Sequence, residues 1–262
     1  MIYMLFLTVC FLASAIGAIC GIGGGVIIKP VLDAFGILGV PSISFLSGCT
    51  VLAMTTYSVG KSRLGKKSGF EAKTGIPLSA GAVAGGIIGK WIFSYISSFS
   101  ADKDRIGAVQ AGCLIVVTIG TLMYTLYKNK IKTYQVRNAF SCMMIGLILG
   151  ILSSFLGIGG GPINLIVLFF FFSMSTKTAA ENSLYIIFFS QLSSLLSTLA
   201  AGSVPEFSFE ILAFMVSGGI LGGIAGRFIN KKISEAMVER LFIGAMSVII
   251  LINIYNLWKF TA

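Results

Sequence analysis

The pentapeptide GIGGG at residues 21–25 occurs a second time at residues 157–161, so the two copies are offset by 136 residues. Each copy follows an apolar run of helical length and precedes a second, shorter apolar run. Four glycines in five residues do not sustain a helix, because each glycine is about 1 kcal/mol less favourable there than alanine. Each copy therefore predicts a break between two helices, one in each half of the chain.

The composition places these breaks in a membrane. Of the 262 residues, 56% are hydrophobic and 11% are charged, and the mean hydropathy is +0.97. Several apolar runs reach the roughly 20 residues that span a bilayer. The sequence therefore predicts an all-α polytopic membrane protein, and we expect a multi-pass location in the inner membrane of a bacterial cell. Broken helices at matching positions of two halves are the usual sequence pointer to a transporter's binding site.

The charged residues exclude several other classes of function. Basic residues outnumber acidic ones by 19 to 9, a formal net charge of +10, but they lie in short stretches between apolar runs. This is the pattern of loops that set membrane topology, and no polar domain is present to bind nucleic acid. The sequence has no histidine and no C-x-x-C among its five cysteines, so we expect no catalytic residue, metal site or cofactor.

Further matches extend the repeat along the whole chain. The segment GGIIGK at residues 85–90 matches GGIAGR at residues 222–227, and Gly81 matches Gly218, both with an offset of 137. We also align Cys49 with Asn182, an offset of 133, by deleting three residues from the preceding loop. The chain is thus predicted to contain two repeats of about five helical segments each. The predicted divisions are a first repeat at 1–127, a cytoplasmic connector at 128–137 and a second repeat at 138–262, with apolar segments at 2–20, 26–40, 42–60, 75–99, 106–127, 138–156, 162–174, 178–201, 207–229 and 241–258.

The distribution of basic residues predicts that the two repeats are inverted. Loop 61–74 carries five basic residues, whereas its counterpart, 202–206, carries only Glu206 as a charged residue. Since basic loops stay cytoplasmic, equivalent loops lie on opposite sides, and both chain ends lie outside. The arms that follow the breaks, 26–40 and 162–174, measure roughly 20–22 Å as helices, less than a hydrocarbon core of about 30 Å. Re-entrant hairpins are therefore favoured over five full crossings in each half.

The glycine breaks are also the predicted binding site. Neither break ends in the Lys-Ser/Thr of a phosphate-binding loop, and close helix packing through small residues is the competing interpretation. A helix that starts after each break presents unpaired N–H groups, which attract anions. Two such helix starts would form one anion site, with Asn164 as a further donor. The predicted site at the breaks comprises Gly23, Gly24, Gly25, Gly159, Gly160, Gly161 and Asn164.

Other polar residues in the apolar runs allow two interpretations each. Lys29 either binds the anion or is neutralised by Asp33, four residues later. Lys90 and Arg227 are equivalent in the repeat, and we expect both to extend to the membrane surface. Glu181 is a candidate to carry a coupling proton. Near the starts of two helices, Cys49, Thr50, Asn182 and Ser183 are candidate substrate-binding residues, with helix capping as the alternative for the polar ones.

The twin glycine breaks, each followed by a short apolar arm with a nearby proline, resemble those of the TauE/SafE-type sulfite and organosulfur-anion exporters. The resemblance covers the whole chain and includes the glycine patterns of residues 81–89 and 218–226. It implies a permease for a small sulfur-containing anion such as sulfite, thiosulfate or a sulfonate, working by alternating access in the lipid bilayer. An anion channel and a membrane-embedded enzyme are the alternatives. The anion, the transport direction, the coupling ion and the oligomeric state are left open.

Overall fold

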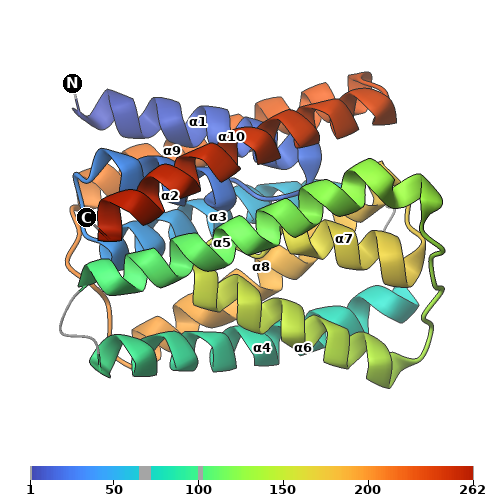
Figure 1. The fold of residues 1–262 in the computed structure, drawn as a ribbon, viewed down its shortest axis with the longest axis horizontal. Helices are drawn as coiled ribbons and strands as arrows, with labels where there is room; N and C mark the ends of the chain where they lie inside the picture. Colours follow the sequence, from blue (N-terminus) through green and yellow to red (C-terminus); the bar gives the residue numbers. More distant parts are fainter. Residues whose placement is uncertain (1, 65–71, 100–102, 262) are drawn as a thin grey trace.

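The computed structural model describes residues 2–64, 72–99 and 103–261, which form α-helices, one short 3₁₀-helix and no strand (Figure 1). The predicted all-α fold class is confirmed. The elements of the first half are α1 (Ile2–Cys20), α2 (Gly25–Phe35), α3 (Val40–Leu64), α4 (Ala72–Phe99) and α5 (Lys103–Tyr127). After η1 (Lys128–Lys130) follow α6 (Ala139–Leu156), α7 (Gly161–Phe172), α8 (Thr176–Ala200), α9 (Phe209–Lys232) and α10 (Glu235–Thr261).

Within the described residues, eight helices are long and apolar enough to cross a membrane. The exceptions are α2 and α7, with 11 and 12 residues. At about 1.5 Å per residue they measure roughly 16–18 Å, about half a bilayer core. In Figure 1, α2 runs back along the direction of α1, and α7 runs back along the direction of α6. Each glycine break is therefore the bend of an unequal hairpin whose first arm is long enough to cross.

The bundle has two ends, which we name by what they contain. The connector end holds residues 128–137, where the Tyr134 amide donates to the Phe170 carbonyl at 2.7 Å. The termini end holds the start of α1 and the end of α10 (Figure 1). The two chain ends thus lie at one end of the bundle, as the predicted topology requires. Residues 65–71 of the predicted cytoplasmic loop 61–74 lie outside the described residues, but Ser62 donates to Glu181 in the first turns of α8, at the connector end.

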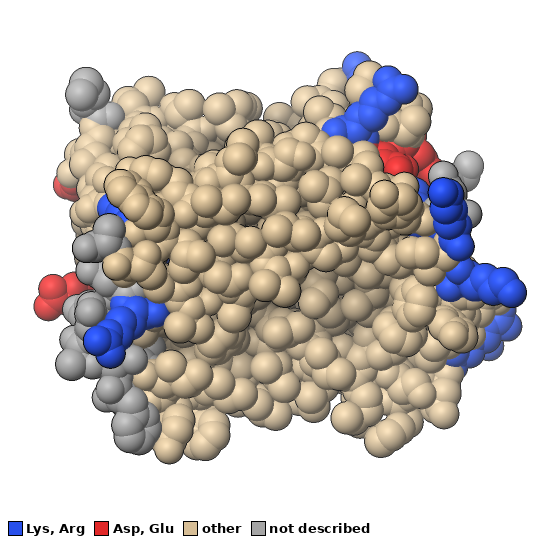
Figure 2. Space-filling model, in the orientation of Figure 1, with Lys and Arg blue, Asp and Glu red and all other residues tan. Residues whose placement is uncertain are grey.

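Charged side chains gather at these two ends. Figure 2 shows lysine, arginine and acidic residues at both ends of the long axis, separated by a broad band without charge. In this view basic side chains are more numerous at the connector end than at the termini end. A charge-free band between charged ends is the surface expected of a protein embedded in lipid, and the positive excess favours a cytoplasmic connector end.

The helix bounds correct one detail of the sequence alignment. The bounds of α3 and α8 differ by 136 residues at both ends, as do the starts of α2 and α7. A Cβ atom placed on Gly23 or on Gly159 would also contact the same two side chains, Val51 and Ile187, themselves 136 apart. The offset of 133 is therefore wrong: Cys49 corresponds to Tyr185, and no three-residue deletion precedes α8.

The repeated glycines of α4 and α9 are packing positions. A Cβ atom on Gly85 would lie 2.1 Å from the Leu147 carbonyl oxygen of α6, and one on Gly222 would lie 2.2 Å from the Phe11 carbonyl oxygen of α1. Gly81 and Gly89 make similar approaches to α6, and Gly218 and Gly226 to α1. Only glycine allows backbones to come this close. Each of these helix pairs joins one helix from the first half to one from the second.

Cysteine labelling tests the predicted topology. Gln135 and Ser203 are exposed at the connector end and near the termini end, respectively. In a background without the five native cysteines, Gln135→Cys should react with a membrane-impermeant thiol reagent only from the cytoplasmic face, and Ser203→Cys only from the other face. The cysteine-free parent is the control. Labelling of both sites from one face would contradict the topology.

Candidate functional site

The two glycine breaks lie against each other in the interior of the bundle. A Cβ atom on Gly25 would lie 2.5 Å from the Ile158 carbonyl oxygen, and one on Gly161 would lie 2.1 Å from the Ile22 carbonyl oxygen. The two contacts are reciprocal, because the residues differ by 136 in each case. We call residues 21–25 and 157–161 the glycine crossing. Any side chain at Gly25 or Gly161 would force the two breaks apart.

The crossing also needs glycine for its backbone conformation. Residues 21, 23, 157, 159 and 160 all have positive φ angles between 67° and 82°, a region that glycine adopts without strain. In the first break, the amides of Gly21, Ile22 and Gly23 all donate to the Gly17 carbonyl, at 2.8 to 3.3 Å. These amides therefore close the end of α1, and the ligand-binding amides predicted for the crossing have to come from the first turns of α2 and α7.

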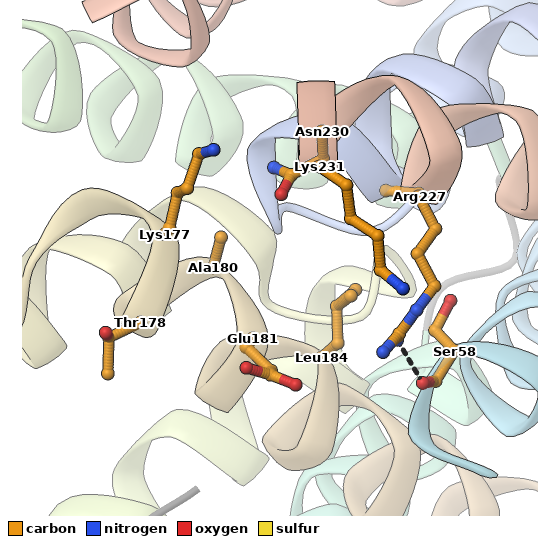
Figure 3. A pocket seen from close by; sticks show the side chains of 10 residues that line it. Ser58, Lys177, Thr178, Ala180, Glu181, Leu184, Arg227, Asn230 and Lys231 are labelled. Carbon is orange, nitrogen blue, oxygen red and sulfur yellow. Dashed lines mark hydrogen bonds between the residues drawn. The ribbon is translucent and has the colours of Figure 1, made fainter. Parts of the chain in front are cut away.

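A cavity of about 280 Å³ opens beside the crossing towards the connector end, and we call it the connector pocket (Figure 3). A Cβ atom on Gly21 would lie 2.2 Å from Cα of Ala180, which lines this pocket, so the first break packs against the wall of the pocket. Among its described lining residues, three basic side chains and one acidic side chain make the lining electropositive. The lining residues are Ala18, Ser58, Lys177, Thr178, Ala180, Glu181, Leu184, Arg227, Asn230 and Lys231.

The charged groups of the connector pocket differ in their contacts. Lys177 donates to the Ile233 carbonyl at 2.6 Å, and Arg227 donates through Nη1 to the Ser58 carbonyl. The Nε of Arg227 is buried and has no partner among the described residues. The Arg227 and Lys231 side chains lie on one side of the view in Figure 3 and Glu181 lies apart from them, and Glu181 accepts a hydrogen bond from Ser62. A guanidinium with an unused buried donor is suited to bind an oxyanion.

A second, much smaller cavity lies on the other side of the crossing, and we call it the termini pocket. Its volume is about 20 Å³. A Cβ atom on Gly157 would lie 3.1 Å from Oγ of Ser44, so the second break supports this pocket as the first supports the connector pocket. The lining residues are Ser44, Phe45, Gly48, Lys90, Phe93, Gln110, Ser154, Gly157, Gln191, Ser194, Leu195 and Thr198.

The two pockets are lined by corresponding positions of the two halves. Seven of the ten residues of the connector pocket have a counterpart in the termini pocket, at offsets of 136 or 137. The pairs are Ala18 with Ser154, Ser58 with Ser194, Ala180 with Ser44, Glu181 with Phe45, Leu184 with Gly48, Arg227 with Lys90, and Asn230 with Phe93. Lys90 and Arg227, which we expected at the membrane surface, thus line equivalent pockets on opposite sides of the crossing.

The structure brings the predicted crossing residues together with Asn164. This side chain is fully buried in the first turn of α7, and neither of its polar atoms has a partner in the described ranges. Its Oδ1 would lie 3.1 Å from a Cβ atom on Gly160, and a Cβ atom on Gly24 would lie 2.7 Å from Oγ of Ser14. A buried side-chain amide without hydrogen-bond partners destabilises the fold unless a ligand or a water molecule forms hydrogen bonds with it.

Other predicted site residues lie on α3 and α8. Thr50 donates to the Leu46 carbonyl of its own helix at 2.9 Å, and Asn182 donates to the Thr178 carbonyl at 2.9 Å. Asn182 lines a separate cavity of about 10 Å³. Ser183 is buried, and its hydroxyl has no partner among the described residues. Cys49 is half-buried on α3 and lines neither of the two pockets.

Lys29 has the neutralising partner that the sequence offered as one alternative. Its ammonium lies 2.6 Å from the Asp33 carboxylate, and the two side chains are only 1% and 5% exposed. Neither residue lines the connector pocket or the termini pocket. The end of α2 is further held by Lys259, which donates to the carbonyls of Asp33 and Ala34 at 3.1 Å.

The sequence analysis missed a polar cluster beside the second break. The hydroxyls of Ser153 and Ser190 lie 3.0 Å apart, and Gln191 Nε2 lies 3.5 Å from Oγ of Ser153. Ser153 contacts the crossing, since a Cβ atom on Gly160 would lie 2.9 Å from the Cβ atom of Ser153. Gln191 lines the termini pocket. The cluster therefore connects crossing and pocket. Polar residues in the middle of apolar runs were the signal that could have revealed it.

Comparison with known proteins agrees with this architecture. The sequence profile of the family described as "Sulfite exporter TauE/SafE" matches residues 6–253. A protein of Bacillus subtilis named "Probable membrane transporter protein YunE" is 23% identical over 261 residues, covering 91% of this chain and 92% of its own length. A "probable membrane transporter protein" of Methanocaldococcus jannaschii is 26% identical over 241 residues, covering 88% of this chain and 87% of its own length.

A third relative, from Haemophilus influenzae and also named a "probable membrane transporter protein", is 25% identical over 250 residues, covering 93% of this chain and 91% of its own length. No solved structure matches the chain significantly. The family profile extends from the first turns of α1 into α10 and so includes both glycine breaks and both pockets. The chain therefore belongs to the TauE/SafE sulfite exporter family of membrane transporters.

Proposed function

We propose that this protein carries a small sulfur-containing anion, such as sulfite, thiosulfate or a sulfonate, across the bacterial inner membrane by alternating access. One observation supports this above all: corresponding residues of the two halves line an open pocket on one side of the glycine crossing and a nearly closed pocket on the other. Two halves that exchange conformations would close the first pocket and open the second. The family description supplies the sulfur anion as substrate class.

In this proposal the anion first enters the connector pocket. Arg227 and Lys231 attract it, and the free Nε of Arg227 donates a hydrogen bond to one of its oxygens. The path from the connector pocket to the termini pocket is closed by the crossing itself and by an apolar cluster that includes Val51, Leu184 and Ile187. Glu181, which also lines the pocket, is the candidate to take up a coupling proton when the anion arrives.

The crossing is the proposed transfer point between the pockets. When the two breaks separate, the first turns of α2 and α7 expose amide donors, and Asn164 adds its free side-chain amide. The predicted residues Gly23, Gly24, Gly25, Gly159, Gly160 and Gly161 allow the anion to approach the backbone closely. The direct contact between the breaks favours a carrier over a channel, since a channel needs a continuous path in one conformation.

Transport by purified protein in liposomes tests this function. We expect the uptake of isotopically labelled sulfite or thiosulfate to saturate and to be accelerated by the same anion on the far side of the membrane. Protein-free liposomes are the control, with a small sulfonate, chloride and acetate as competitors to define selectivity. Linear uptake without acceleration by internal anion would indicate a channel and overturn the carrier mechanism.

A further inference from the structure

We infer that the termini pocket is a second docking site for the transported oxyanion, in which Lys90 serves as the cation that Arg227 provides at the connector end. The inference rests on the proposed transport function and adds residues that neither the sequence nor the family assigns. It concerns the membrane face at the termini end, which we call the termini face; the membrane face at the connector end is the connector face.

The Lys90 ammonium lies in a position that is unfavourable for a charged group. It makes no hydrogen bond or ion pair within the described part of the chain, and its one recorded contact is with the ring of Phe93, 5.0 Å from the centroid. It is half-buried and lies nine residues before the end of α4, or roughly 13 Å along the helix axis. A charge at that depth is expensive unless it serves transport or finds a partner.

Other polar groups around Lys90 are also without partners. The hydroxyls of Ser44 and Ser154 and the Oε1 atom of Gln110 are buried and make no hydrogen bond to any described residue. Ser154 is 5% exposed and Gln110 is 1% exposed. The two hydroxyls can donate to an oxyanion, and the Gln110 oxygen can accept from a bound water or from the proton of a hydrogen-bearing oxyanion. An ammonium, two hydroxyls and an amide oxygen thus surround one small space.

The present volume of the termini pocket explains why these groups are unused. A space of about 20 Å³ holds roughly one water molecule, so an oxyanion cannot enter in this conformation. The equivalent space at the connector end measures about 280 Å³. If the two halves exchange conformations, the termini pocket acquires the larger volume, and the ammonium of Lys90 meets the anion from that face.

The inference also predicts a difference in affinity between the two faces. Among the described lining residues, the connector pocket has three basic side chains and one acidic side chain, a net charge of +2, whereas the termini pocket has the charge of Lys90 alone, +1. This net charge is the lower one even though the neutral ring of Phe45 takes the position that corresponds to the acidic Glu181. We therefore expect a higher KM for the anion at the termini face than at the connector face.

Sided kinetics in oriented proteoliposomes test the role of Lys90, with sulfite as the probe. Lys90→Met keeps an unbranched side chain, one heavy atom shorter, and removes the charge. It should raise the KM for sulfite added at the termini face about tenfold or more, because a charge-assisted hydrogen bond is lost. The KM at the connector face should change less than about twofold. Arg227→Met, the matched variant, should show the opposite pattern, and Lys90→Arg should recover most of the wild-type KM.

The outcomes separate this inference from the transport function. Equal KM values for wild type and Lys90→Met at the termini face, with transport intact, would overturn the docking site and leave the carrier standing. Equal loss at both faces would show that Lys90 supports the fold or the crossing, and would also overturn it. If Lys90→Met does not insert, Ser154→Ala and Ser44→Ala replace it and should raise the KM at the termini face alone. Absence of transport by the wild type would instead overturn the proposed function.

Discussion

Replacing Gly161 with alanine is expected to reduce transport at least about tenfold while the protein still inserts into the membrane. The added Cβ atom would lie 2.1 Å from the Ile22 carbonyl oxygen, and a backbone atom cannot move aside as a flexible side chain can. The two breaks must therefore separate, and overpacking of this kind costs about 1–3 kcal/mol. The reciprocal variant Gly25→Ala, with a distance of 2.5 Å to the Ile158 carbonyl oxygen, should act in the same direction.

A glycine elsewhere in the chain provides the control. Gly244 lies in α10, and a Cβ atom there would meet nothing within 4 Å. Gly244→Ala should transport at the wild-type rate and gain up to about 1 kcal/mol in helix stability. Initial uptake rates per reconstituted protein, with size-exclusion profiles in detergent, measure both effects. Wild-type uptake by Gly161→Ala and Gly25→Ala would show that the crossing is a packing contact without a role in transport.

Removing the ammonium of Lys29 is expected to destabilise the protein by about 3–5 kcal/mol, because Lys29→Met leaves the buried Asp33 carboxylate without its counter-ion. The other oxygen of that carboxylate, Oδ1, is already buried without a partner among the described residues. The double variant Lys29→Met with Asp33→Asn should recover most of the loss, since no charge then remains buried. Denaturant-induced unfolding in mixed micelles measures the free energies.

An exposed lysine gives the matched comparison for this cycle. Lys130→Met changes an exposed residue at the connector end and should alter the free energy of unfolding by less than about 0.5 kcal/mol. The contrast between Lys29 and Lys130 separates the loss of a buried ion pair from the loss of net charge. Unchanged stability of Lys29→Met together with weaker anion binding would identify Lys29 as a ligand.

The sequence predicted the architecture because membrane helices leave a strong signal. Apolar runs, basic loops and two copies of GIGGG were enough for the helical fold and the hairpin bends. The offset of 133 between Cys49 and Asn182 was wrong because it relied on three loosely similar residues in apolar surroundings. The constant offset of α3 and α8 became visible only through their bounds and through Val51 and Ile187 at the crossing.

The pockets could not be predicted in the same way. Which face of α4 or α9 points inward depends on the glycines that pack on α6 and α1, and both faces of these helices are apolar in sequence. Lys90 and Arg227 were therefore assigned to the membrane surface by their position along the helix alone. Their equivalence in the repeat was a usable signal, because extension to the lipid surface does not require a basic residue at matching positions.

The pairing of α1 with α9 and of α4 with α6 has a consequence for the synthesis of the protein. Each pair brings together helices from different halves, so the repeated glycines of α4 and of α9 find their backbone partners only in the other half. The α1 helix is made before α9 by nearly the whole length of the chain. At about 5–20 residues per second, it waits roughly 10–40 s in the membrane before α9 is complete. During biogenesis the first half must therefore persist as an inserted set of helices without a finished interior, which is completed only when α6 packs on α4 and α9 packs on α1.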